Sequence, residues 1–167
     1  MSVVETSFTN QNNANWVEMH PETVPSWLRS VIANHLSSSL AEWILYFNTE
    51  RSGTHNNQWL LIDRRRVQTK SNIIWALDEA FSLTETTDMT PYLLENGFVG
   101  SYNMPISKTV YDKLGIQGSD YWTDPRAVIL KRYHPRMLTI EDMKHWLVHN
   151  DEDDVRVGLA PRYSSID

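Results

Sequence analysis

The stretch Ser52-Gly53-Thr54-His55-Asn56-Asn57-Gln58-Trp59 is the most informative part of this sequence. A glycine turn and a run of amide side chains come directly before the apolar residues 59–62, which are predicted to form a strand. Amides at the mouth of a strand suit the binding of a developing oxyanion, because they donate hydrogen bonds without carrying charge. A polar turn that only leads into a core strand would look the same, so this stretch alone leaves both interpretations open.

Two helices are predicted ahead of this stretch. The first follows Pro25, with Ser26 as its N-cap, and its apolar residues recur at helical spacing, so we expect them to face the core. These residues are Trp27, Leu28, Val31, Ile32 and Leu36. Ser39 and Glu42 form a capping-box pattern that opens the second helix. Its expected buried stripe consists of Leu40, Trp43, Ile44 and Phe47.

Strands and shorter helices are predicted in the rest of the chain. The first twenty residues indicate a strand and a loop around Phe8 and Trp16. Residues 58–63 and about 72–77 are expected to pair as a hairpin across Arg64–Ser71. Short helices are expected over about 90–97, 106–115 and 124–133, and from Thr139 onward. Thr90 and Asp124 are predicted N-caps because proline follows each of them, and Thr139 with Asp142 opens the last helix.

Composition narrows the possible classes of function. The 167 residues, of which 41% are apolar, suit a single domain over residues 1–167. A net charge of −6 argues against a nucleic-acid partner, and Arg64-Arg65-Arg66, the one basic run, is interpreted as a solvated surface. No apolar stretch approaches the ~20 residues of a membrane span. The sequence contains no cysteine, which excludes disulfides and thiolate metal sites, and we expect no cofactor.

Three further features could carry chemistry, and each has a simpler interpretation. His145 and His149 have metal-ligand spacing, but the glutamate of a zinc protease motif is absent, so surface histidines are expected. The acidic run 151–154 lacks the alternation and glycine of a calcium loop. Ser2 would become an N-terminal nucleophile after removal of Met1, but the residues that follow do not resemble a nucleophile strand.

Two more motifs change the interpretation of the amide-rich stretch. They are Gly100-Ser101-Tyr102-Asn103-Met104-Pro105 and Asp124-Pro125-Arg126-Ala127-Val128-Ile129-Leu130-Lys131-Arg132. In this order and spacing the three motifs resemble the phospholipase B-like family of N-terminal-nucleophile hydrolases. The resemblance covers about residues 5–150, including Asn15-Trp16, Ala33-Asn34, Trp43 and Phe47-Asn48.

The resemblance implies an α+β fold, a partial αββα sandwich in which helix pairs pack against antiparallel strands. It also implies hydrolysis of acyl bonds in phospholipids or in related amides and esters. The family nucleophile is a cysteine, exposed by internal cleavage upstream of the matched region, and its own α-amino group serves as the base. This sequence has no cysteine, and matched against the family it starts late and stops early. We therefore expect a central or C-terminal portion of such a hydrolase.

The resemblance also assigns roles to individual residues. Asn103 matches the active-site asparagine that donates to the oxyanion, and Arg126 matches the active-site arginine. Near a helix N-terminus Arg126 opposes the helix dipole, a cost that is tolerated more readily if a carboxylate or a substrate anion pairs with it. Asn56 and Asn57 match an amide pair, of which one is expected to face the site. His55, Trp59 and Tyr102 are expected to contact substrate.

Departures from the family pattern leave a rival interpretation open. His55 replaces an aromatic residue, and Leu77-Asp78-Glu79-Ala80 and Phe98-Val99-Gly100 replace other family segments, as does Val148-His149-Asn150; these changes put substrate choice and activity in question. The rival is a catalytically inactive relative that acts as a scaffold, or as a subunit whose partner chain supplies the nucleophile. An exposed apolar strand edge or patch would fit a missing partner, and we expect one. The family resemblance implies a lysosomal or extracellular location, although the first five residues do not look like a signal peptide.

Overall fold

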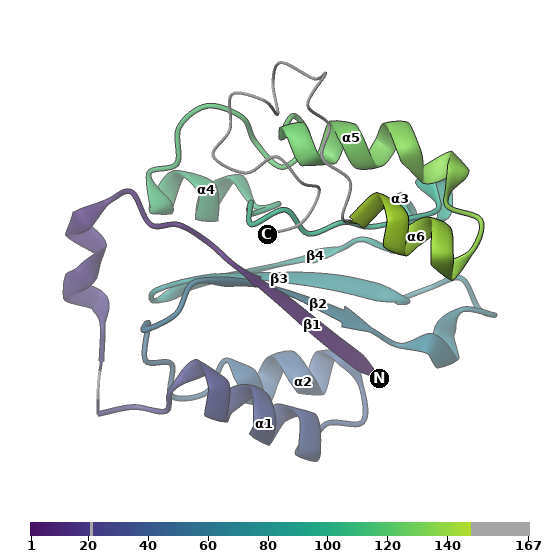
Figure 1. Cartoon of the computed structure of the whole chain (residues 1–167). Helices are drawn as coiled ribbons and strands as arrows, with labels where there is room; N and C mark the ends of the chain where they lie inside the picture. The colour runs from purple at the N-terminus through teal and green to yellow at the C-terminus, as the bar shows by residue number, and fades with distance from the viewer. Residues whose placement is uncertain (21, 148–167) are drawn as a thin grey trace. The chain divides into compact units, whose positions relative to one another are not determined.

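The computed structural model of the chain describes residues 1–20 and 22–147 (Figure 1). The chain divides into two compact units, Met1–Gly118 and the residues from Ser119 onward. A single domain over the whole chain stays a prediction.

A four-stranded antiparallel sheet forms the centre of the first unit, with the strand order β1-β2-β3-β4 (Figure 1). The strands are β1 (Ser2–Ser7), β2 (Asn57–Ile62), β3 (Ile74–Ala80) and β4 (Leu83–Asp88). The predicted hairpin is confirmed, although β3 begins two residues later than expected and extends to Ala80. The register pairs Trp59 with Leu77 and Glu5 with Trp59, so alternate residues of neighbouring strands share a face.

Helices α1 (Ser26–Leu36) and α2 (Leu40–Phe47) cover one face of this sheet (Figure 1). The core beneath them consists of Ala33, Leu40, Trp43, Phe47, Trp59, Leu61 and Leu77. The rings of Trp43 and Phe47 stack with their centroids 4.7 Å apart. The predicted capping box of α2 is confirmed, because the Ser39 hydroxyl accepts from the Glu42 N–H at 3.2 Å.

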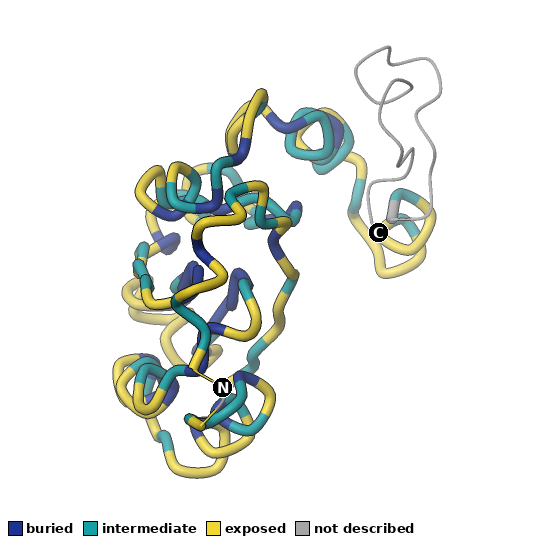
Figure 2. The backbone as a smooth tube through the Cα atoms, turned by 90° about the vertical axis from the view of Figure 1, so that its left-hand side faces the viewer, coloured by how far each residue is buried: buried dark blue, intermediate teal, exposed yellow. Residues whose placement is uncertain are grey.

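The predicted core face of α1 is wrong. Trp27 is 67% exposed and Leu36 is 60% exposed, whereas Ser26, Arg29 and Ala33 are buried. The reason is an ion pair: a guanidinium nitrogen of Arg29 lies 2.6 Å from a carboxylate oxygen of Glu79 on β3. Burying that pair turns the apolar residues of α1 outward. In Figure 2 the two helices at the foot of the view show both exposed and buried positions.

The N-cap of α1 also differs from the prediction. Ser26 is the first helical residue, and the N-cap is Pro25, which makes no side-chain cap. The Ser26 hydroxyl instead accepts from Arg29 at 3.0 Å and helps to orient that guanidinium. Ser26 therefore stabilises the buried ion pair and does not cap the helix.

Two short helices, α3 (Thr90–Asn96) and α4 (Lys108–Leu114), follow the sheet in the first unit. α4 lies across the sheet from α1 and α2 (Figure 1). A second apolar cluster gathers Phe8, Ala80, Phe81, Val110, Leu114 and Ile116. Thr90 was predicted to be the N-cap of α3, but the N-cap is Met89 and Thr90 is the first helical residue. The Thr90 hydroxyl accepts from the Ile73 and Ile74 N–H groups and so ties α3 to the start of β3.

The second unit contains α5 (Pro125–Tyr133) and α6 (Ile140–Leu147). The predicted cap of α5 is confirmed, because the Asp124 carboxylate accepts from the Arg126 N–H at 2.9 Å. The Thr139–Asp142 box that opens α6 is also confirmed. His149 and the acidic run 151–154 lie outside the described residues. Three short 3-10 helices complete the described elements: η1 (Asn13–Glu18), η2 (Arg64–Arg66) and η3 (His134–Arg136).

Both inner strands of the sheet, β2 and β3, are paired on both sides. The expectation of an unpaired strand with an exposed apolar edge is therefore wrong for the described part of the chain. The alternative form of that expectation, an exposed apolar patch, fits α1, where Trp27, Val31 and Leu36 are exposed. A search of residues 1–20 and 22–147 found no helix long and apolar enough to cross a membrane. It also found no group of three metal-ligating side chains.

Candidate functional site

The turn before β2 requires its glycine. Gly53 has a φ of +67°, and a Cβ there would lie 3.0 Å from the backbone oxygen of Glu18 and 3.4 Å from the Cα of Phe81. Three distant segments therefore meet at this turn: the end of η1, the amide-rich stretch and the β3–β4 hairpin. This close approach brings the amides after Gly53 to the end of the sheet.

Asn56 is tied into this meeting point by its backbone and its side chain. Its side-chain oxygen accepts from the Phe81 N–H at 2.8 Å. Its backbone carbonyl accepts from the Phe8 N–H, also at 2.8 Å. The side-chain nitrogen donates to no residue in the described part of the chain, so it remains available to a ligand. The exposed side chain of His55 precedes Asn56 at the mouth of the strand.

Asn57 and Trp59 face the helix-covered side of the sheet. Asn57 is 1% exposed, and its side-chain nitrogen donates to the carboxylate of Glu5 on β1. Trp59 packs against the rings of Trp43 and Phe47, with centroids 5.6 and 5.0 Å away. Since successive residues of a strand point to opposite faces, Gln58 points to the other side. A substrate contact for Trp59 stays a prediction, and its surface is taken up by the core.

The opposite face of the sheet carries a buried polar network that our sequence reasoning missed. Gln58 donates to the Asp78 carboxylate at 2.9 Å and accepts from the Ser101 hydroxyl at 2.6 Å. The second oxygen of Asp78 accepts from the Ser107 N–H at 2.7 Å. The Ser101 hydroxyl also lies 2.5 Å from that of Thr6 on β1. One pair of side chains on β2 and β3 thus anchors both ends of the segment 101–107.

A sequence signal for this network did exist. The segment that forms β3 contains Asp78 and Glu79 in a run that is otherwise apolar, and every residue of β3 except Trp75 is buried. Carboxyl groups in a buried strand need partners. The two acids point to opposite faces, so they need two partners, and these are Gln58 and Arg29.

Burial raises the pKa of Asp78 to about 6, and the nearby Glu85 on β4 adds to this. The hydrogen bonds from Ser107 and Gln58 act in the opposite direction, and the effect of burial is larger. A carboxyl group with a pKa near neutrality, close to a cluster of amides, is typical of functional sites.

Asn103 lies in the middle of the anchored segment 101–107. Its φ is +56°, in the left-handed region that asparagine tolerates better than most residues. Its side-chain nitrogen donates to the Ser7 carbonyl at 3.0 Å. The Ser7 carbonyl and the Phe8 N–H belong to one peptide group, whose N–H is bound by Asn56. Asn103 and Asn56 therefore flank the same peptide at the end of β1.

Tyr102 is held by a close approach to the backbone. It is 5% exposed, and a Cβ on Gly100 would meet its hydroxyl oxygen at 2.2 Å. Only glycine at position 100 leaves room for this ring. The three conspicuous residues of the Ser101-Tyr102-Asn103 motif thus have different surroundings: a buried network, a packed ring and a half-buried amide.

Arg126 belongs to the second unit. It lies in the first turn of α5, and its Nε is 3.3 Å from the Asp124 carboxylate. A carboxylate thus pairs with this arginine. Asp124 serves both as the N-cap of α5 and as the partner of Arg126, which offsets the unfavourable position of a cation at a helix N-terminus.

The chain belongs to the phospholipase B family, because the family model described as phospholipase B matches residues 1–155. It is 30% identical to phospholipase B-like protein D of Dictyostelium discoideum, over 90% of this chain and 29% of that protein. It is 29% identical to putative phospholipase B-like 2 of Homo sapiens, over 89% of this chain and 28% of that protein. It is 31% identical to phospholipase-B 81 of Drysdalia coronoides, over 78% of this chain and 26% of that protein.

These matches confirm the family inferred from the three motifs. The chain spans less than a third of the length of these curated relatives.

Proposed function

We propose that the chain contributes the oxyanion-binding part of an acyl hydrolase that acts on phospholipids or on related amides and esters. The observation that carries the proposal is the position of Asn103, an uncharged donor in a left-handed conformation, on a segment anchored at both ends by Gln58 and Asp78. A donor held in advance costs no reorganisation when charge develops on the substrate oxygen. Membership of the phospholipase B family supports the class of reaction.

In this proposal Asn103 donates to the oxyanion, and Asn56 supplies a second amide from the same end of the sheet. Arg126 orients a substrate anion or the nucleophile, with Asp124 holding its side chain. His55 and Tyr102 contact the substrate. Gln58 and Asp78 position the segment and do not touch the reacting atoms. The architecture is a partial αββα sandwich of the N-terminal-nucleophile type, and the setting is lysosomal or extracellular, as the family resemblance implies.

In this proposal the nucleophile comes from outside this sequence, because a cysteine is absent from it. A partner chain that supplies this cysteine is therefore part of the proposal. The same observation favours a second candidate, an inactive relative that keeps the scaffold and serves as a subunit or an interaction module.

Hydrolysis of a labelled phospholipid by the purified chain, combined with the cysteine-bearing partner chain that the proposal requires, tests the first candidate. We expect turnover to fall by at least about a hundredfold in Asn103→Ala, as is typical for loss of one oxyanion donor, and to fall in Arg126→Ala. Asn13→Ala is the matched control, because Asn13 is an exposed asparagine of η1. No turnover by the folded chain together with its partner chain, or equal losses in all three variants, would contradict the first candidate and favour the second.

A further inference from the structure

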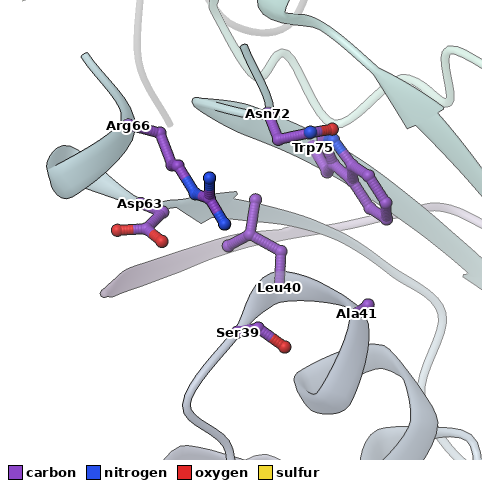
Figure 3. A pocket seen from close by; sticks show the side chains of 7 residues that line it. All are labelled: Ser39, Leu40, Ala41, Asp63, Arg66, Asn72 and Trp75. Atoms are coloured by element: carbon purple, nitrogen blue, oxygen red, sulfur yellow. The ribbon is translucent and has the colours of Figure 1, made fainter. Parts of the chain in front are cut away.

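We propose that the opposite end of the sheet binds a phosphoryl group that carries an apolar or aromatic substituent. The site lies between the N-terminus of α2 and η2, which follows the end of β2 (Figure 3). The amide cluster lies at the start of β2, and six residues of strand separate the two, a distance of about 20 Å. The inference goes beyond the proposed function and does not depend on it.

Two adjoining hollows form this site, with volumes of about 260 and 380 Å³. They share Ser39, Asp63 and Arg66. The first continues along Leu40, Ala41, Asn72 and Trp75, and the second along Ser38, Arg65 and Thr69. The first has an apolar wall and the second is polar, so together they suit a small molecule with an apolar part and a charged part.

The cation at the centre is Arg66. Its guanidinium makes no ion pair and no side-chain hydrogen bond with any described residue, although the arginine beside it is fully engaged. Figure 3 shows its side chain reaching over Leu40, between Asp63 on one side and Asn72 and Trp75 on the other. An unengaged guanidinium has five N–H donors in a planar fork, which matches two oxygens of a phosphoryl group.

The acidic group in the site, the Asp63 carboxylate, is already paired with Arg65. Arg65 donates to both oxygens of the Asp63 carboxylate, at 2.8 and 2.9 Å, and this holds the pKa of Asp63 down to about 2. A third bond from Arg65 reaches the Ser38 carbonyl at 2.7 Å and fixes η2 against the start of α2. Asp63 therefore stays ionised and occupied, and it does not compete for Arg66.

The charge balance favours an anion. The charged residues that line the two hollows are Asp63, Arg65 and Arg66, and Asp63 is paired with Arg65. An excess of one positive charge, that of Arg66, therefore remains in a protein whose net charge is −6. The planar fork of this guanidinium matches two oxygens of a phosphoryl group, which is negatively charged at pH 7.

The apolar wall of the first hollow favours a phosphoryl group with an apolar or aromatic substituent. Leu40 is buried and Trp75 is half-buried, and both line the hollow beside Arg66. The indole nitrogen of Trp75 is buried without a hydrogen-bond partner in the described residues. A flat or aliphatic substituent would pack on the Trp75 ring.

The probes that test the site are inorganic phosphate, phenyl phosphate and a short-chain phosphatidic acid, added to the full chain. Binding is followed by the shifts of the Trp75 indole and Arg66 Nε signals in NMR spectra. We expect phenyl phosphate to bind more tightly than inorganic phosphate, and Arg66→Gln to weaken its binding by about tenfold or more. Arg64→Gln is the matched control, because Arg64 belongs to the same basic run but lines neither hollow.

Each outcome decides the question. Saturable binding of phenyl phosphate that depends on Arg66 and not on Arg64 supports the site. If phosphatidic acid binds more tightly than phenyl phosphate, the ligand of the site is a lipid headgroup. If phenyl phosphate binds more tightly, the ligand is a soluble phosphate ester. No saturable shift with any probe at millimolar concentration, or equal losses in Arg66→Gln and Arg64→Gln, would overturn the proposal. Asn103→Ala should leave this binding unchanged, so failure of the hydrolase proposal would not affect this result.

Discussion

Asn103 combines an unusual backbone with a candidate catalytic side chain, and the two contributions can be separated by mutation. Its φ of +56° strains a side chain such as alanine but not glycine. We expect Asn103→Gly to be more stable than Asn103→Ala by about 1 kcal/mol in urea unfolding. Both variants should lose hydrolysis equally, since neither has the amide. If Asn103→Gly instead retained turnover while Asn103→Ala lost it, Asn103 would be needed only for its backbone conformation and not for its amide.

Asp78 gives the stability of the fold a pH dependence of its own. Because its pKa is raised from 3.8 to about 6, the folded state holds its proton where the unfolded state has lost it. The stabilisation is complete below pH ~4 and is lost as the pH rises to ~6, an effect on the order of 3 kcal/mol. In Asp78→Asn this part of the dependence should disappear.

The measurement for Asp78 is the urea midpoint from pH 4 to 7, for the natural chain and for Asp78→Asn. Burial also raises the pKa of Glu79, so the natural chain has a second contribution with the same sign. The difference between the two proteins isolates Asp78, because Glu79 is present in both. Identical slopes in the two proteins would show that Asp78 is ionised throughout this range.

At the scale of the element, α1 buries an ion pair while most of its large apolar residues are exposed. Arg29 contacts Glu79, the Phe47 carbonyl and the Phe47 ring, whose centroid is 4.3 Å away. We expect Arg29→Ala to lower the free energy of unfolding by about 3–5 kcal/mol, because it removes the ion-pair partner of the buried Glu79 carboxylate.

Trp27→Ala is the contrasting variant on the same helix. Trp27 is 67% exposed, so its loss should cost less than about 1 kcal/mol. Chemical denaturation of both variants compares the two faces of α1 directly. A larger loss for Trp27→Ala than for Arg29→Ala would mean that the apolar face of α1 is covered in solution, and the orientation of α1 described above would be wrong.

At the scale of the whole molecule, the first unit contains everything needed for a core. Both apolar clusters and all four strands lie within residues 1–118. We therefore expect a fragment of residues 1–118 to unfold cooperatively and to keep the near-ultraviolet circular dichroism of its packed tryptophans. It should bind phenyl phosphate, because both hollows beside Arg66 lie within it. A fragment without a cooperative transition would show that the first unit depends on the second.

Much of the fold could be predicted from local patterns. The Ser39–Glu42 capping box, the stripe of α2, the Asp124 cap and the glycine ends of α3 and α4 were all recognisable, because each depends on residues within one or two turns of each other. The orientation of α1 was not, since Arg29 meets Glu79 fifty residues later in the chain. Apolar spacing correctly indicated a helix, but it did not identify the face that is buried.

The candidate site divides in the same way. The sequence by itself determined the family, the helix and strand content of most segments, and the identity of Asn56, Asn103 and Arg126 as candidates, since motifs are local. Only the tertiary structure decided that Asn57 and Gln58 point to opposite faces, that Asp78 anchors the segment around Asn103, and that Arg66 lies free in a hollow. These features depend on strand register and on contacts between distant segments, and no pattern of neighbouring residues encodes them.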